Sequence, residues 1–190
     1  FYYQDQYGEL KLPLPNILGE FQLENASTAI STLRVLEHLK INDEHIKLGL
    51  TKVKSIARLQ EIKKGKIKDL CKNNRVFCDG SHNPDGARVL NNFLDTLKCR
   101  KHIIIGMMAN KDHVKYMSYF KNISSLTTID IPNQIHSIKG EDLKKKLSNY
   151  PNVNYKTSVK DAIKSINLLD GDIILITGSL YLAGEVLNLN

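Results

Sequence analysis

The sequence has no tryptophan, few cysteines and no long uninterrupted hydrophobic run. A membrane-spanning helix needs about 18 to 20 apolar residues in succession, and no stretch of this chain approaches that length. The N-terminal stretch FYYQDQYGELKLPLP also lacks the basic, apolar and small-residue order of a secretory signal. We therefore expect a cytoplasmic protein that does not associate with membranes.

Several common site motifs are also missing. Cys71, Cys78 and Cys99 lack CxxC spacing, so they predict reduced thiols rather than a disulfide framework or a zinc site. The sequence contains no GxxxxGK[ST] phosphate loop, no GxGxxG fingerprint, no HExxH and no GxSxG. It therefore has no nucleotide-phosphate loop of its own, no metalloprotease site and no serine-hydrolase elbow. We predict no metal ligands in this chain.

The composition is that of an ordinary globular protein. The chain has 190 residues, 42% of them hydrophobic and 25% charged, which suits one full domain and part of a second. The net charge of +7 attracts anions, but the lysines are spread over the chain without interleaved aromatic residues. We interpret them as a solvated surface and expect no nucleic-acid partner; strongly salt-dependent binding of nucleic acid would contradict this interpretation.

Two parts of the chain differ in pattern. The apolar residues of QLENASTAISTLRVLEHL have helical spacing, and Asn42 or Asp43 can cap a second helix. We therefore expect residues 1–54 to be the helical tail of a domain whose body lies upstream. Residues 55–190 begin with three expected strands, RLQEIKK, GKIKDLC and RVFCDG, and then alternate helix and strand. This alternation predicts an α/β fold with a Rossmann-like, mostly parallel sheet flanked by helices on both faces. HIIIG and DIILIT are apolar throughout, as central strands are.

Three polar clusters follow expected strands: DGSHNP after RVFC, GMMANKD after HIII, and TGS after DIILI. In an open α/β sheet, ligands bind beyond the carboxyl ends of the strands. We therefore expect the three clusters to face the same edge of the sheet and to form the binding site.

DGSHNP carries the most information of the three. Asp79 ends a strand, Gly80 allows a tight turn, and Asn83-Pro84 is a favourable helix start. His82 would then lie near free amide donors at a helix N-terminus, a place that favours phosphate or carboxylate. The alternative is that Asp79 and Asn83 only satisfy the turn and cap the helix.

The other two clusters are open to the same two interpretations. Ser179 in TGS can present a hydroxyl group to an anion, or it can simply cap the last helix. Asp112 in GMMANKD can belong to a binding loop, or it can cap the helix that follows.

Taken in order, LPNILGEFQLENASTAI, ARLQEI, DGSHNPDGA, GMMANKD and TGSLYLAGEV resemble the C-terminal half of the folylpolyglutamate synthase and dihydrofolate synthase family, a branch of the Mur ligase superfamily. The resemblance covers essentially the whole chain. It implies an ATP- and Mg²⁺-dependent amide ligase, a monomer, that adds L-glutamate to dihydropteroate or a folate through an acyl phosphate. It also implies that residues 1–54 end the central ATP-binding domain and that residues 55–190 are the Mur ligase C-terminal, glutamate-side domain.

The resemblance also implies roles for individual residues. Asn25 matches the asparagine of HQxxN, which contacts the adenine side of ATP, and Arg58 matches the arginine of GRxQ, which reaches the phosphates. Asp79 matches the aspartate of DGAHNP, which the family uses for the ribose. His82 matches the histidine of that motif, the catalytic residue near the γ-phosphate and the incoming glutamate. Ser179 matches a serine that helps to hold glutamate.

Two departures from the family pattern stand out. Phe21 occupies the place of the histidine of HQ, and Ala57 occupies the place of the glycine of GRxQ. In the family, the phosphate loop, the magnesium ligands, most of the folate site and the determinants of pterin choice lie upstream. The resemblance therefore covers both synthase activities, and we expect this chain by itself to be inactive.

Two other functions stay open at this stage. One is a different Mur-type amino-acid ligase, such as one that builds peptidoglycan. The other is a non-catalytic Rossmann-like domain that binds an amino acid or docks onto a separately encoded ATPase.

Overall fold

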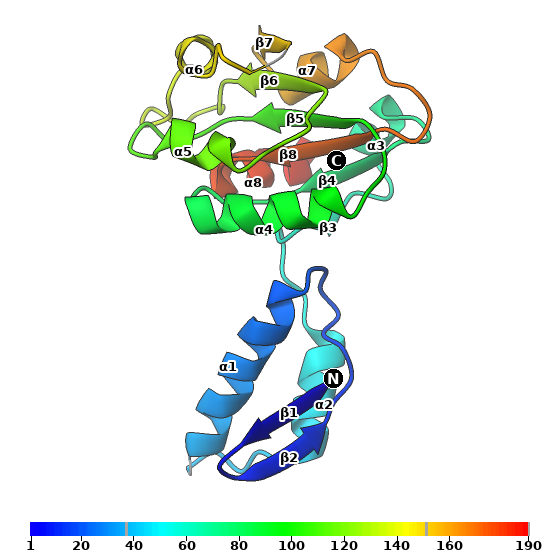
Figure 1. Cartoon of the computed structure of the whole chain (residues 1–190), viewed down its shortest axis with the longest axis vertical. Coiled ribbons are helices and arrows are strands. Elements are labelled where there is room, and N and C mark those ends of the chain that lie inside the picture. Colours follow the sequence, from blue (N-terminus) through cyan, green and yellow to red (C-terminus); the bar gives the residue numbers. More distant parts are fainter. Residues whose placement is uncertain (37, 151, 190) are drawn as a thin grey trace. The chain divides into compact units, whose positions relative to one another are not determined.

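The computed structural model describes residues 1–36, 38–150 and 152–189, and it divides the chain into two compact units, Phe1–Ile56 and Ala57–Asn190 (Figure 1). The sequence pattern placed the division between residues 54 and 55. No helix among the described residues has both the length and the apolar character needed to cross a membrane.

The first unit pairs a β-hairpin with two helices. The antiparallel strands β1 (Tyr2–Asp5) and β2 (Gly8–Lys11) are followed by α1 (Phe21–Val35) and α2 (Asp43–Lys52). Both helices were predicted, and the cap of α2 is Asn42, whose side chain accepts a hydrogen bond from the His45 N–H. Side chains from all four elements or their ends form a small core: Tyr3, Leu12, Ile30, Ile46 and Leu50.

The second unit is built on a sheet of six strands in the order β3-β4-β8-β5-β6-β7. β3 pairs antiparallel with β4, and the other neighbours are parallel, so the predicted α/β fold with a mostly parallel sheet is confirmed. The strands are β3 (Gln60–Glu61), β4 (Arg75–Cys78), β5 (Lys101–Ile105), β6 (Ser125–Ile129), β7 (Val153–Lys156) and β8 (Ile173–Thr177).

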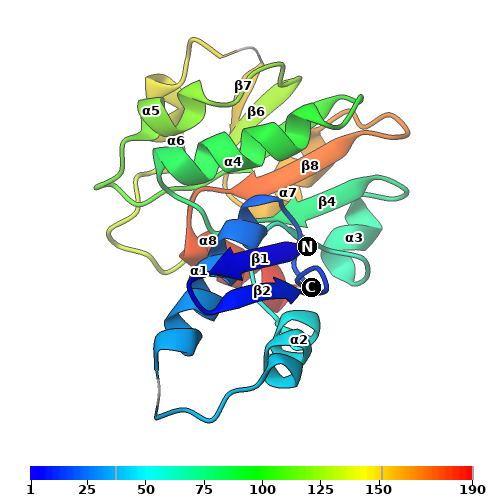
Figure 2. The same ribbon diagram turned by 60° about the horizontal axis from the view of Figure 1, so that its bottom comes forward.

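Helices cover both faces of this sheet, and α4 lies across it in Figure 2. Successive residues of a strand point to opposite faces, and accordingly Phe77 belongs to one buried cluster while Val76 and Cys78 belong to the other. One face packs against α3 (Lys66–Leu70), α7 (Val159–Ser165) and α8 (Leu180–Leu189), and the other against α4 (Pro84–Asp95), α5 (His113–Ser118) and α6 (Gly140–Lys146). β5 and β8 are buried along their whole length, as their apolar sequences predicted.

The prediction of a strand over GKIKDLC was wrong, because this segment forms the helix α3. Ile67 and Cys71 are both fully buried, four residues apart, whereas Asp69 between them is exposed. A strand would have placed all three side chains on one face and so buried the carboxylate of Asp69. The helical turn brings Ile67 and Cys71 to the same side while Asp69 points to water.

The three cysteines are free thiols, as predicted. Burial raises the pKa of Cys71 to about 11 and that of Cys78 to about 12. Both side chains therefore stay protonated at neutral pH and behave as small apolar groups within the core.

A polar cluster around the buried Asp172 ties together the amino ends of β5 and β8. The Asp172 carboxylate accepts hydrogen bonds from the Arg100 guanidinium at 3.0 and 2.6 Å and from the Leu169 N–H at 2.7 Å. It also accepts from Nε2 of His102 at 3.3 Å, and Nδ1 of His102 lies 2.7 Å from the Ser125 hydroxyl. The hydrogen bond from Arg100 lowers the pKa of Asp172 to about 2, and burial lowers the pKa of His102.

These two shifts predict that stability falls with acidification. An unfolded chain protonates His102 near pH 6.5 and Asp172 near pH 4, whereas the folded chain takes up both protons only at lower pH. The stabilisation by Asp172, about 2 kcal/mol, is therefore complete above about pH 4 and is lost as the pH approaches 2. Urea unfolding at a series of pH values should show this decline.

The variant Asp172→Asn tests the assignment. It should lower the free energy of unfolding by about 2 kcal/mol at pH 7 and flatten the pH profile below pH 4. The matched control is Asp142→Asn, because Asp142 is 57% exposed and forms its ion pair with Lys145 on the surface. A pH profile of Asp172→Asn that parallels the wild type below pH 4 would contradict the assignment.

Candidate functional site

The three polar clusters lie side by side at the carboxyl edge of the sheet, as predicted, because β4, β8 and β5 are adjacent and parallel. We call residues 79–83 the DGSHN turn and residues 177–179 the TGS turn. The Asp79 N–H donates to the Ile176 carbonyl at 3.0 Å, and the Gly178 N–H donates to the Ser81 carbonyl at 3.1 Å. The two turns therefore continue the pairing of β4 with β8 beyond the ends of the strands.

The glycines of these turns allow close packing. Gly178 has a φ of +107°, and a Cβ atom on it would lie 2.7 Å from the Gly106 carbonyl oxygen at the end of β5. A Cβ atom on Gly80 would overlap the side chain of Leu180 at the start of α8. A larger residue at position 178 would therefore clash with the backbone of Gly106, and one at position 80 would require the Leu180 side chain to move.

The carboxylate of Asp79 is turned inward and is only 3% exposed. Its Oδ2 accepts a hydrogen bond from the Leu59 N–H at 2.6 Å, and its Oδ1 accepts one from the Ser81 N–H at 2.7 Å. Asp79 thereby fastens the DGSHN turn to residues 57–60, which we call the ARLQ turn. This is the turn-supporting interpretation from the sequence, and the ribose contact that the resemblance implies stays a prediction.

The ARLQ turn presents Arg58 to solvent. The buried residues Ala57 and Leu59 flank it, and the Gln60 side chain accepts a hydrogen bond from the Ala57 N–H at 3.0 Å. The Gly80 N–H donates to the Ala57 carbonyl at 2.9 Å. Arg58 itself is exposed and takes part in none of the ion pairs between described residues. Its guanidinium is therefore accessible to solvent, and its five N–H donors in a fixed fork suit an anion.

The departure at Ala57 has a structural consequence. Ala57 has a φ of +57° and Leu59 a φ of +46°, both in the left-handed region. Glycine adopts that conformation at little cost, whereas for alanine it is less favourable by about 1 kcal/mol. The turn keeps this shape despite alanine, and Asp79, Gln60 and Gly80 supply the hydrogen bonds that hold it.

His82 is half-buried at the end of the DGSHN turn. Its Nδ1 lies 3.2 Å from the Gly80 carbonyl oxygen. Because a carbonyl only accepts, this contact requires the proton on Nδ1, which leaves Nε2 of the neutral ring with a free lone pair. Asn83 then caps α4 by accepting from the Gly86 N–H at 2.8 Å, and Pro84 is the first helical residue, as predicted.

Ser179 and Asp112 both act as helix caps. The hydroxyl oxygen of Ser179, which is 2% exposed, accepts from the Tyr181 N–H at 3.1 Å in the first turn of α8. The Asp112 side chain accepts from the Lys115 N–H at 3.0 Å and caps α5. The capping interpretation of each is therefore present in the structure, and a glutamate contact of Ser179 stays a prediction.

A buried chain of three hydroxyl groups lies beneath the two turns, and sequence reasoning missed it. The Tyr116 hydroxyl on α5 lies 3.0 Å from the Ser81 hydroxyl and 2.7 Å from the Thr177 hydroxyl. We call these three side chains the hydroxyl chain. Burial raises the pKa of Tyr116, so the phenol stays protonated and can donate to one neighbour while it accepts from the other. The one signal in the sequence was Ser81, which stands where the motif DGAHNP has alanine.

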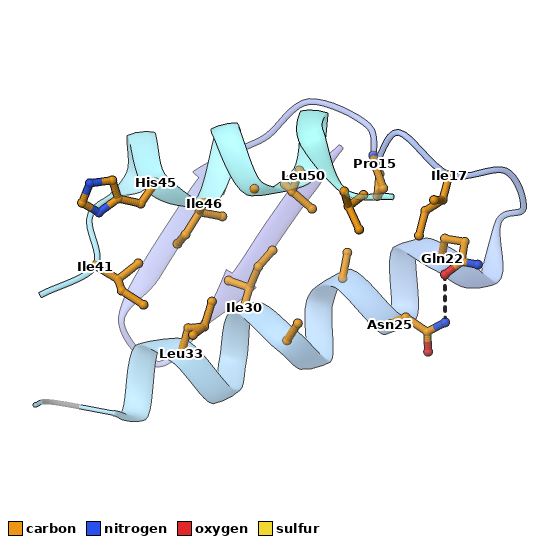
Figure 3. Close-up of a pocket in the computed structure, with 14 residues that line it drawn as sticks. Pro15, Ile17, Gln22, Asn25, Ile30, Leu33, Ile41, His45, Ile46 and Leu50 are labelled. Atoms are coloured by element: carbon orange, nitrogen blue, oxygen red, sulfur yellow. Dashed lines mark hydrogen bonds between the residues drawn. The ribbon is translucent and has the colours of Figure 1, made fainter. Parts of the chain in front are cut away.

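Asn25 lies in the first unit, whereas Arg58, Asp79, His82 and Ser179 all lie in the second. It is an exposed residue of α1 whose side-chain N–H donates to Gln22 at 3.1 Å. Figure 3 shows both residues at one end of an apolar groove between α1 and α2. The groove has a volume of about 350 Å³, and its largest apolar side chains are Ile17, Ile30, Leu33, Ile41, Ile46 and Leu50.

Among the described residues, no group of three or more His, Cys, Asp or Glu side chains is arranged to hold a metal ion. The donor groups at the carboxyl edge are instead Arg58, His82 and backbone N–H groups, which suit anions.

Comparisons with protein families and with known proteins agree with one another. Residues 58–180 match the family model described as Mur ligase, glutamate ligase domain. A folylpolyglutamate synthase from Lacticaseibacillus casei is 28% identical over 198 residues, an alignment that covers 98% of this chain and 42% of that protein.

Solved structures give the same picture for the fold. E. coli FolC in complex with DHPP and ADP superposes with a TM-score of 0.81 at 24% identity, covering 97% of this chain and 42% of that one. A bifunctional folylpolyglutamate synthase/dihydrofolate synthase with Mn, AMPPNP and L-glutamate bound gives a TM-score of 0.82 at 21% identity, covering 98% and 43%. The chain thus spans less than half the length of each of these relatives.

Proposed function

The chain belongs to the Mur ligase family, because residues 58–180 match its glutamate ligase domain, and we propose that it is the glutamate-side part of an ATP-dependent amide ligase. The proposed reaction adds L-glutamate to dihydropteroate or to a folate. One observation supports this most: a single buried carboxylate, Asp79, joins the turn that exposes Arg58 to the turn that carries His82. Such an arrangement holds a permanent cation and a proton acceptor at one edge of the sheet.

The proposal includes the organisation of the chain. Residues 1–54 would end the central ATP-binding domain, and residues 55–190 would be the glutamate-side domain. Asn25, exposed on α1, would contact the adenine side of ATP. A monomeric state and a cytoplasmic location belong to the same proposal.

ATP and a divalent metal ion are supported by the solved relatives, which were crystallised with ADP or with AMPPNP and Mn. We propose Mg²⁺ as the metal. When bound, it would neutralise charge on the ATP phosphates. The described residues of this chain hold no cluster for it, so we assign no residue here to the metal.

The reaction would proceed in two steps. The carboxylate of the pterin substrate attacks the γ-phosphorus of ATP, which forms an acyl phosphate and releases ADP. The amine of glutamate then attacks the acyl carbon, the bond to phosphate breaks, and an amide forms with loss of one proton. In the first step, the exposed guanidinium of Arg58 would bind phosphate oxygens and oppose their negative charge.

His82 would act in the second step. Its Nδ1 donates to the Gly80 carbonyl, so its Nε2 is the nitrogen that can accept the proton of the glutamate ammonium and make the amine nucleophilic. The Ser179 oxygen accepts a hydrogen bond from the Tyr181 N–H, so its O–H group can act as a donor. That O–H group would donate a hydrogen bond to a carboxylate of glutamate. The resemblance to the family also gives Asp79 a contact with the ribose, and we include that contact in the proposal.

The direct test is a ligation assay on the natural protein that carries this sequence. With ATP, Mg²⁺ and glutamate, we expect ADP formation to depend on dihydropteroate or a folate. A UDP-muramyl precursor should not replace that substrate, which separates this function from a peptidoglycan ligase. Absence of ADP formation with every acceptor would favour a non-catalytic binding domain instead.

A further inference from the structure

The hydroxyl chain joins three elements that come from distant parts of the sequence. Ser81 belongs to the DGSHN turn, Thr177 to the TGS turn, and Tyr116 to α5. Tyr116 and Thr177 are fully buried and Ser81 is 9% exposed. Because the Tyr116 hydroxyl is buried away from bulk solvent, removing it costs Ser81 and Thr177 a hydrogen-bond partner within the core.

Tyr116 is a firm anchor for this chain. Its ring packs 5.5 Å from that of Phe120, and Met117 beside it is also fully buried. The start of α5 is held by the buried His113, whose Nε2 contacts the Met108 carbonyl at 3.0 Å. A phenylalanine would fill the same space, so packing alone does not require the hydroxyl group.

The residues that the hydroxyl chain restrains are neighbours of the site residues. Ser81 immediately precedes His82, and Thr177 lies two positions before Ser179. Ser81 also accepts the Gly178 N–H through its carbonyl, so a shift of either turn disturbs both bonds. Ser81 stands where the motif DGAHNP has alanine, so the resemblance to the family does not itself imply this connection.

We propose that Tyr116 is a positioning residue that, through Ser81 and Thr177, holds the DGSHN and TGS turns at a fixed separation for glutamate binding. This role rests on the proposed function. Tyr116 touches no reacting group; it acts by keeping His82 and Ser179 in place at the neighbouring carboxyl ends of β4 and β8.

The test compares Tyr116→Phe, Ser81→Ala and the double variant in the natural protein. Tyr116→Phe should raise the KM for glutamate about tenfold and change the KM for ATP little. Hydrogen-deuterium exchange of the peptide that contains Gly178 should speed up by a similar factor. Ser81→Ala should have a smaller effect, and the double variant should be no worse than Tyr116→Phe, because the two hydroxyl groups act on each other.

The matched control is Tyr155→Phe. This variant removes a hydroxyl group that donates a hydrogen bond to the Asp130 carboxylate at 2.6 Å. Tyr155 lies on β7, at the far end of the sheet from β4. If Tyr116→Phe resembles this control in both glutamate KM and exchange near Gly178, the positioning role is wrong. If the wild-type protein ligates no glutamate, the proposed function fails, and the exchange measurement alone decides whether Tyr116 holds the two turns together.

Discussion

Replacing His82 with alanine in the natural protein should lower kcat for glutamate ligation about 100-fold, and Arg58→Ala should lower kcat/KM by a similar factor. A side chain that transfers a proton usually contributes a rate factor of about this size. A side chain whose charge stabilises the phosphoryl group during its transfer contributes a similar factor. Both side chains project from turns held by backbone and Asp79 contacts. Their loss should therefore leave the free energy of unfolding within about 1 kcal/mol of the wild type.

Two further variants sharpen this comparison. Arg58→Lys keeps the charge but not the forked donor geometry, so it should restore only part of the activity. Lys145→Ala is the control, because the Lys145 side chain is 69% exposed and forms a surface ion pair with Asp142 on α6. Steady-state kinetics and urea unfolding measure both properties. Equal loss of activity in Arg58→Ala, His82→Ala and Lys145→Ala would show that the site assignment is wrong.

The second large effect is expected at Asp79. Asp79→Ala should lower the free energy of unfolding by about 3 kcal/mol, because it leaves the buried N–H groups of Leu59 and Ser81 without an acceptor. It should also reduce ligation more than the stability loss explains, since the turn that carries Arg58 is released. Asp79→Asn keeps one acceptor oxygen and should show an intermediate loss of stability.

The control for Asp79 is Asp112→Ala. Asp112 accepts a single exposed N–H at the start of α5, so its removal should cost only about 1 kcal/mol. The comparison also tests the ribose contact. If Asp79→Ala raises the KM for ATP but unfolds at the same urea concentration as the wild type, nucleotide binding is its main role and the turn-holding role is wrong.

Local patterns in the sequence were enough for most of the fold. The apolar runs of β5 and β8 predicted central strands, and Asn42 and Asn83 predicted the starts of α2 and α4. Both kinds of signal depend on residues close together along the chain. The helix α3 was missed because only the finished core shows that Ile67 and Cys71 share one face while Asp69 lies outside it.

The sequence by itself therefore determined the α/β fold and the meeting of three polar clusters at one edge of the sheet, because strand direction and helix caps follow from local spacing. Only the tertiary structure decided how those clusters are held. Asp79 reaches Leu59 across 20 positions and Tyr116 reaches Thr177 across 61. Such hydrogen bonds depend on which buried donors and acceptors the packed sheet brings together, and no short motif encodes that pairing.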